Sequence, residues 1–178
     1  MKLQLFKYSV NPLLAVCLLV LLLLSNCNFT SSHSFPLNEP ITTGMEGRTL
    51  PSFNLLSTNG VAFNSNDIPL GKPVILLFIR PDCPFCEAQI DEIIDNIELL
   101  INFRIYLVTS YPLEELKVIY KKRDLKKYNN ITAASDPENF FRRYFSVKSV
   151  PYTVIYDEQK KLSRVYVGFI GVSEILQL

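Results

Sequence analysis

Two cysteines three residues apart have the type and spacing to do chemistry in this 178-residue chain. Cys83 and Cys86 follow an unbroken apolar run, residues 74–79, and precede apolar side chains at helical spacing. This pattern predicts a buried strand that leads into a helix, with the pair at the first helical turn. Unpaired N–H groups and the positive dipole end of a helix stabilise a thiolate, the form that attacks a disulfide. We therefore expect Cys83, the outer residue, to be the nucleophile and Cys86 to resolve the mixed disulfide.

Two other interpretations of the pair are half of a zinc site and two inert buried cysteines. A structural zinc ion needs four ligands, usually Cys or His. The remaining cysteines, Cys17 and Cys27, belong to the first 27 residues, and the single histidine, His33, lies in a polar stretch. The ligand count therefore argues against a metal site within one chain, and no cofactor is expected. The strand-to-helix position of the pair favours redox chemistry over inert cysteines.

Further short motifs surround the cysteines in a fixed order. The set consists of Leu50-Pro51-Ser52-Phe53, Thr58-Asn59-Gly60, Gly71-Lys72-Pro73, Cys83-Pro84-Phe85-Cys86 and Val150-Pro151-Tyr152-Thr153. From about Gly47 to its C-terminus the chain thereby resembles the thioredoxin-like fold. Within that fold it resembles the extracytoplasmic thiol–disulfide oxidoreductases of the TlpA/ResA type, which are grouped with the redoxin (AhpC/TSA-like) domains. The resemblance implies an α/β three-layer sandwich, in which a central mixed sheet has helices on both faces and an N-terminal β-hairpin extension.

The resemblance also implies a role for the segment around Pro151. In this fold the proline before the strand that faces the cysteine pair is cis, so we expect a cis Val150–Pro151 bond with the proline ring near the cysteines. The backbone of Val150 would then offer strand-like hydrogen bonds to a bound polypeptide. Between the cysteines, Pro84 suits the first turn of a helix, where amide N–H groups are unpaired anyway. Pro84 and Phe85 together are expected to influence the redox potential.

Three positions depart from the pattern of the resembled families. Thioredoxins have a buried acid in the central strand, where this chain has Leu77, and ResA-type proteins have a glutamate where it has Gln89. The proton acceptor for the second cysteine is therefore unassigned. Glu87 is near in sequence, but its side chain need not point to that cysteine. Asp82 replaces the aromatic residue that often precedes the first cysteine, and its carboxylate is expected to oppose thiolate formation there.

Residues 1–27 are predicted to be a targeting segment. A basic start and an apolar run of twelve residues, 13–24, suit a signal-peptide core and fall short of the about 20 residues of a membrane span. Leu24-Ser25-Asn26-Cys27 resembles a bacterial lipobox, in which Cys27 would be lipidated and become the mature N-terminus, although Asn26 is not the usual small residue. A cleaved signal without lipid and an uncleaved anchor are the alternatives. All three place the domain outside the cytoplasm.

The rest of the chain divides into a tether and a domain. Residues 28–46 are polar and without periodicity, which predicts a flexible tether, and residues 47–178 are long enough for one domain with a core. The expected elements are a hairpin at 53–63, strands at 72–79, 103–109 and 131–134, helices at 84–101 and 113–128, a helix from 135 or 136, a closing hairpin at 152–168 and a short helix from 172.

The favoured hypothesis is a membrane-tethered thiol–disulfide oxidoreductase that exchanges disulfides with proteins of the cell envelope or periplasm. The TlpA/ResA resemblance favours a reductant, which would need a membrane electron donor because soluble cytoplasmic reductants cannot reach it. One alternative is a peroxiredoxin, but that class places a threonine where this chain has Arg80. Another is a non-catalytic binding module, although the copper-delivery members of the fold use a downstream histidine and none follows His33. The net charge of +1 gives no strong field for nucleic acid.

Overall fold

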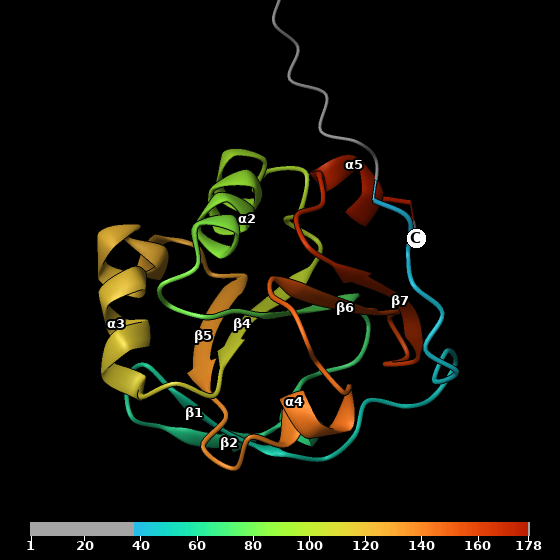
Figure 1. Ribbon diagram of the computed structural model, residues 1–178, viewed down its shortest axis with the longest axis horizontal. Helices are drawn as coiled ribbons and strands as arrows, with labels where there is room; N and C mark the ends of the chain where they lie inside the picture. Colours follow the sequence, from blue (N-terminus) through green and yellow to red (C-terminus); the bar gives the residue numbers. More distant parts are fainter. Residues whose placement is uncertain (1–37, 178) are drawn as a thin grey trace, which may run out of the picture. The chain divides into compact units, whose positions relative to one another are not determined.

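The computed structural model describes residues 38–177, whose strands form one seven-stranded sheet in the order β2-β1-β5-β4-β3-β6-β7 (Figure 1). The strands are β1 (Asn54–Ser57), β2 (Ala62–Asn64), β3 (Val74–Phe78), β4 (Arg104–Thr109), β5 (Ile131–Ser135), β6 (Tyr152–Tyr156) and β7 (Leu162–Val167). The helices are α2 (Pro84–Asp95), α3 (Leu113–Lys122), α4 (Phe140–Tyr144) and α5 (Val172–Ile175), with 3₁₀ turns η1 (Ser65–Asp67) and η2 (Leu125–Lys127). The predicted thioredoxin-like α/β fold with a mixed sheet is confirmed.

Strand β3 is an interior strand of the sheet, between β4 and β6, and is buried along its whole length. It pairs in parallel with β4 and antiparallel with β6. Because side chains alternate along a strand, Ile75 and Leu77 enter one core, and Leu76 and Phe78 enter the other. A strand buried on both faces explains why the sequence is apolar without interruption here.

Helices cover both faces of the sheet. The core that contains Ile75 and Leu77 also contains the apolar residues of α2, α3 and α5, among them Ile90 of α2 and Leu116 of α3. The opposite core contains α4, together with apolar residues that precede and form β1. This arrangement gives the three layers that the sequence predicts.

An aromatic cluster attaches α4 to the sheet. Phe141 is fully buried and stacks on Phe78 with ring centroids 5.0 Å apart, while Phe145 lies 4.6 Å from Phe141. Phe53 contacts the same ring edge-on at 6.4 Å. Phe141 and Phe145 are thus buried core residues that fix α4 to the sheet.

Two helices end earlier than their apolar spacing predicts. Helix α2 ends at Asp95 because the side chain of Asn96 donates to the carbonyl of Glu92 at 2.9 Å, and the next bonds connect residues three apart. Apolar side chains near residues 97–101 continue in these turns instead of in the helix. Helix α3 ends at Lys122, since Asp124 adopts a left-handed backbone conformation, φ 47°, that a helix cannot continue through.

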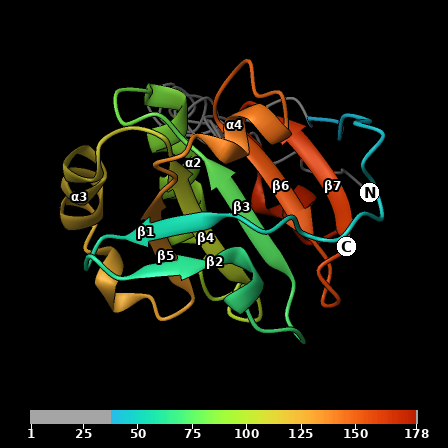
Figure 2. The same cartoon turned by 90° about the horizontal axis from the view of Figure 1, so that it is seen from below.

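Residues 38–46, which the sequence assigns to the tether, contact the domain along β7 (Figure 2). The amide of Asn38 donates to the carbonyls of Val167 and Phe169 at 3.0 and 2.9 Å, and the N–H of Ile41 donates to the carbonyl of Val165 at 2.8 Å. Contacts with the domain therefore begin before residue 47. Cys27 and the predicted leader lie outside the described residues. Within residues 38–177 no helix is long and apolar enough to cross a membrane.

Candidate active site

The cysteine pair lies where β3 leads into α2. Cys83 is the N-cap of α2 with an extended backbone, φ −102° and ψ 111°, and Pro84 occupies the first turn. The main-chain N–H of Cys86 donates to the sulfur of Cys83 at 3.3 Å. Both cysteines are free thiols. The predicted position at a helix N-terminus is confirmed, and an N–H group of the first turn is directed at the outer sulfur.

The two cysteines differ in their relation to the cavity next to them. Both are buried in the core beneath α2, Cys83 at 5 % and Cys86 at 1 % exposed, but Cys83 also lines a cavity of about 490 Å³ that Cys86 does not line. Burial raises the pKa of Cys86 to about 12, and the neighbouring Cys83 contributes in the same direction. Cys86 is therefore a neutral thiol near pH 7, while Cys83 is the sulfur that a substrate can reach.

The side chains expected around Cys86 do not provide a carboxylate. Leu77 is buried on β3. The Gln89 amide is fully buried and holds the backbone of Ile170, donating to its carbonyl at 2.9 Å and accepting from its N–H at 2.7 Å. Glu87 is turned to α3, where a hydrogen bond from Arg123 lowers the pKa of this carboxyl. Gln89 thus has a structural role, and Glu87 stays ionised in an ion pair.

Asp82 is not an isolated charge beside Cys83. Its carboxylate accepts from the Nε of Arg80 at 2.7 Å, and both side chains are about half or more exposed. The guanidinium of Arg80 therefore offsets the negative charge of Asp82 beside Cys83. This ion pair was not predicted from the sequence, because Arg80 was considered there only as the residue that stands where peroxiredoxins have a threonine. Opposite charges on either side of Pro81 were the available signal for this pair.

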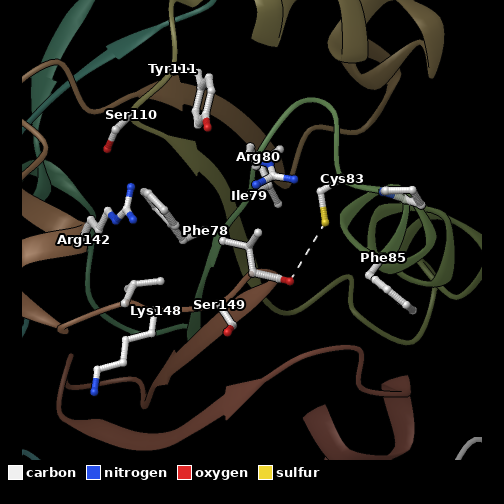
Figure 3. A pocket seen from close by; sticks show the side chains of 13 residues that line it. Phe78, Ile79, Arg80, Cys83, Phe85, Ser110, Tyr111, Arg142, Lys148 and Ser149 are labelled. Carbon is white, nitrogen blue, oxygen red and sulfur yellow. Dashed lines mark hydrogen bonds between the residues drawn. The ribbon is translucent and has the colours of Figure 1, made fainter.

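The loop before β6 meets the cysteine pair. The Val150–Pro151 bond is cis, as predicted, and the Val150 carbonyl lies 4.0 Å from the sulfur of Cys83 (Figure 3). Strand β6 begins at the next residue, Tyr152, which is opposite Phe78 in the register with β3. Pairing with β3 thus brings Val150 to Cys83 across 67 residues of sequence.

The cavity beside Cys83 is lined from several elements that are distant in sequence (Figure 3). Arg80 and Cys83 follow β3, Tyr111 follows β4, Arg142 lies on α4, and Lys148 precedes the cis bond. Sequence reasoning did not assign Tyr111, Arg142 or Lys148 to the site, because only the fold brings these loops together. Among the described residues, no acidic side chain lines this cavity.

Phe85 separates this cavity from a second, mainly apolar one. Its ring is 69 % exposed and lines both cavities, as does Val150. The second cavity has a volume of about 530 Å³ and is also bordered by Ala88, Gly168 and Phe169. The surface around Cys83 therefore offers a polar side and an apolar side. Within residues 38–177 no group of three or more His, Cys, Asp or Glu side chains could hold a metal ion.

A sheet of this topology, with paired cysteines at a helix N-terminus opposite a cis proline, defines the thioredoxin-like thiol–disulfide oxidoreductases. The chain belongs to the AhpC/TSA family, whose family model matches residues 47–168. No curated protein matches the sequence.

Several solved structures share the fold. The exposed lipoprotein thioredoxin Etrx1 of Streptococcus pneumoniae is 25% identical with a TM-score of 0.60, and the match covers 71% of this chain and 96% of that one. A secreted disulfide oxidoreductase of Mycobacterium tuberculosis, described as homologous to E. coli DsbE, is 20% identical with a TM-score of 0.56, covering 67% and 86%. StoA of Bacillus subtilis is 12% identical with a TM-score of 0.55, covering 70% and 93%.

Proposed function

We propose that this protein is a membrane-tethered oxidoreductase that reduces disulfides of envelope proteins, with Cys83 as nucleophile and Cys86 as resolving thiol. One observation carries the proposal. The sulfur of Cys83 lies at the α2 N-terminus, lines a cavity and is 4.0 Å from the Val150 carbonyl, while Cys86 is buried one turn further on. The geometry suits an extended polypeptide that pairs with the backbone at Val150 and presents its disulfide to Cys83.

The reaction takes place in two exchange steps. The Cys83 thiolate attacks one sulfur of the substrate disulfide, so that a bond from Cys83 to the substrate forms and the other substrate sulfur leaves as a thiolate. Cys86 then loses its proton and attacks Cys83, which releases the second substrate sulfur. The two protons of the enzyme dithiol end on the two substrate sulfurs. The substrate gains two electrons, and the enzyme keeps a Cys83–Cys86 disulfide.

A dithiol donor must return the enzyme to its reduced form. The leader predicted at residues 1–27, with Cys27 as candidate lipid attachment site, supports an extracytoplasmic position at a membrane. The S. pneumoniae protein is described as an exposed lipoprotein, and the M. tuberculosis protein is described as secreted. Both descriptions support the same compartment for this chain. The donor would then be a membrane protein that presents a dithiol on the outer side.

Trapping of the mixed disulfide tests the assignment. Cys86→Ser leaves the attack intact but prevents release, so this variant should accumulate disulfide-linked adducts with envelope proteins. Cys83→Ser is the matched control and should yield few adducts, because the remaining thiol is buried. Adducts are measured on non-reducing gels after acid quenching, and their partners are identified by mass spectrometry.

Three results would contradict parts of this proposal. Absence of adducts from Cys86→Ser, together with a wild-type pair that never forms a disulfide, would exclude thiol–disulfide exchange. Equal trapping by both variants would leave the exchange chemistry standing but remove the assignment of Cys83 as the nucleophile. An equilibrium with glutathione that leaves the pair mostly reduced under oxidising buffers would instead indicate an oxidant.

A further inference from the structure

We propose that the cavity beside Cys83 selects disulfides whose cysteines have acidic neighbours in sequence. The proposal rests on the function proposed above and adds a substrate class to it. Three cationic residues, Arg80, Arg142 and Lys148, are among the described residues that line this cavity, and no acidic residue is. Such a one-sided charge distribution attracts anionic groups and disfavours cationic ones.

Two of the three cationic charges of the cavity have no partner among the described residues. Arg80 is paired with Asp82 through its Nε only. The side chains of Arg142 and Lys148 form no ion pair or hydrogen bond within the described part of the chain. Two full charges are therefore available for a ligand. In contrast, Lys122 and Arg123 beside α2 are neutralised by acids of that helix.

Arg142 is the best placed of these groups. Figure 3 shows its guanidinium directed into the cavity from α4, whereas the ammonium of Lys148 points away from Cys83. The backbone of Arg142 is fixed on both sides. The preceding residue, Phe141, is fully buried in the aromatic cluster. The carbonyl of Arg142 itself accepts from the N–H of Val147 at 3.0 Å. The backbone of Arg142 is thereby fixed, and its planar guanidinium, unpaired among the described residues, can bind a carboxylate through two hydrogen bonds.

The position of the cavity relative to Cys83 determines which residues of a bound substrate would lie near its cationic side chains. A polypeptide that pairs with the backbone at Val150 and places its sulfur at Cys83 continues over residues 147–149, which line the same cavity. Side chains one or two positions from the substrate cysteine therefore lie within reach of Arg142. Beyond Phe85 the second cavity has no charged side chain among its described lining residues, so the selection acts on one side of the cysteine.

The test compares three disulfide-linked peptides that differ only beside the cysteine, with glutamate, glutamine or lysine there. Single-turnover reduction by the pre-reduced protein is followed after acid quenching, and each rate is divided by the rate with dithiothreitol, because neighbouring charges alter the disulfide itself. At about 0.05 M salt the glutamate peptide should react roughly fivefold faster than the lysine peptide, and the ratio should fall towards one as salt screens the charges.

Arg142→Gln should remove at least half of this preference. Arg143→Gln is the matched control, since Arg143 follows on α4, is exposed and does not line the cavity, and it should leave the preference unchanged. Equal normalised rates for all peptides in the wild type would overturn the selection. An equal loss in both variants would overturn the role of Arg142. Failure to reduce any peptide would instead contradict the proposed oxidoreductase function itself.

Discussion

One helical turn separates two buried thiols, of which only the first borders the cavity at the site. Cys83 accepts the N–H of Cys86 and lines that cavity, while Cys86 lies further inside the same core. Burial disfavours negative charge on the inner sulfur. The order of the reaction follows from this difference, because the accessible sulfur reacts first and the buried one only within an enclosed mixed disulfide.

Titration of the buried thiol is a prediction at this scale. In Cys83→Ser, the alkylation rate of native Cys86 should rise only well above pH 9, since burial raises its pKa from 9.0 to about 12. The raised pKa also makes the stability of the fold depend on pH. The thiol loses its proton near pH 9 in the unfolded chain and near pH 12 in the native one. The contribution of this group to the free energy of unfolding is therefore complete below pH 9 and is lost between pH 9 and 12.

The measurement uses iodoacetamide and mass spectrometry across pH. The same variant in urea is the control and should be alkylated with a midpoint near 9. A native midpoint at or below that of the unfolded control would contradict the burial of Cys86.

At the scale of elements, α4 shows how a short helix is kept in place. It has five residues, too few to be stable alone, so its position depends on Phe141. The helix begins later than residue 135 or 136, where the sequence predicts its start: Asn139 is the N-cap, and the Asp136 carboxylate accepts from the N–H of Phe141 at 2.8 Å. Because Arg142 is the next residue, this anchoring also sets one wall of the cavity.

Removal of the central ring should therefore destabilise the domain. Phe141→Ala is expected to lower the free energy of unfolding by about 3–5 kcal/mol, the usual cost of a buried Phe-to-Ala cavity. Phe140→Ala is the control and should cost clearly less, because Phe140 is only partly buried. Urea unfolding followed by circular dichroism gives both values. Equal losses in the two variants would show that α4 is not held through Phe141.

Strands and turns with a regular sequence pattern could be predicted from the sequence. The lining of the cavity, which comes from several elements distant in sequence, could not. The alternation of Ile75, Leu76 and Leu77 between two cores required only an apolar run, and the Asn59-Gly60 turn indicated the β1–β2 hairpin. The contact of Arg142 with the cavity depends on how α4 packs under β3. The end of α2 at Asp95 depends on one side-chain bond from Asn96. Neither leaves a periodic signal in the sequence.

At the scale of the whole molecule, the domain and its proposed membrane attachment come from different parts of the chain. The family model begins at residue 47, whereas backbone contacts with β7 already begin at Ile41. Residues 28–37 therefore remain as the predicted tether between Cys27 and the described domain. The proposed anchor can be changed without touching the site, because the cavity residues that the structure describes all follow residue 77.

Replacement of the candidate lipid site tests this proposal. Cys27→Ala should prevent lipid attachment and leave the leader uncleaved or processed elsewhere, while the trapping reaction of Cys86→Ser is retained in the double variant. Metabolic labelling with a fatty acid and mass spectrometry of the N-terminus measure the change. Unchanged processing and membrane retention would indicate an ordinary signal peptide or an uncleaved anchor.

The passage of residues 41–50 along β7 has a consequence for self-association. Strand β7 is the last of the sheet, and an open edge of this kind invites pairing with another chain. Ile41 and Gly47 donate to the carbonyls of Val165 and Leu162, and Leu162 donates back to Arg48. The edge thus carries hydrogen bonds from its own chain, and the opposite edge strand, β2, has only three residues. We expect the domain to resist strand-to-strand aggregation even when many copies are crowded together.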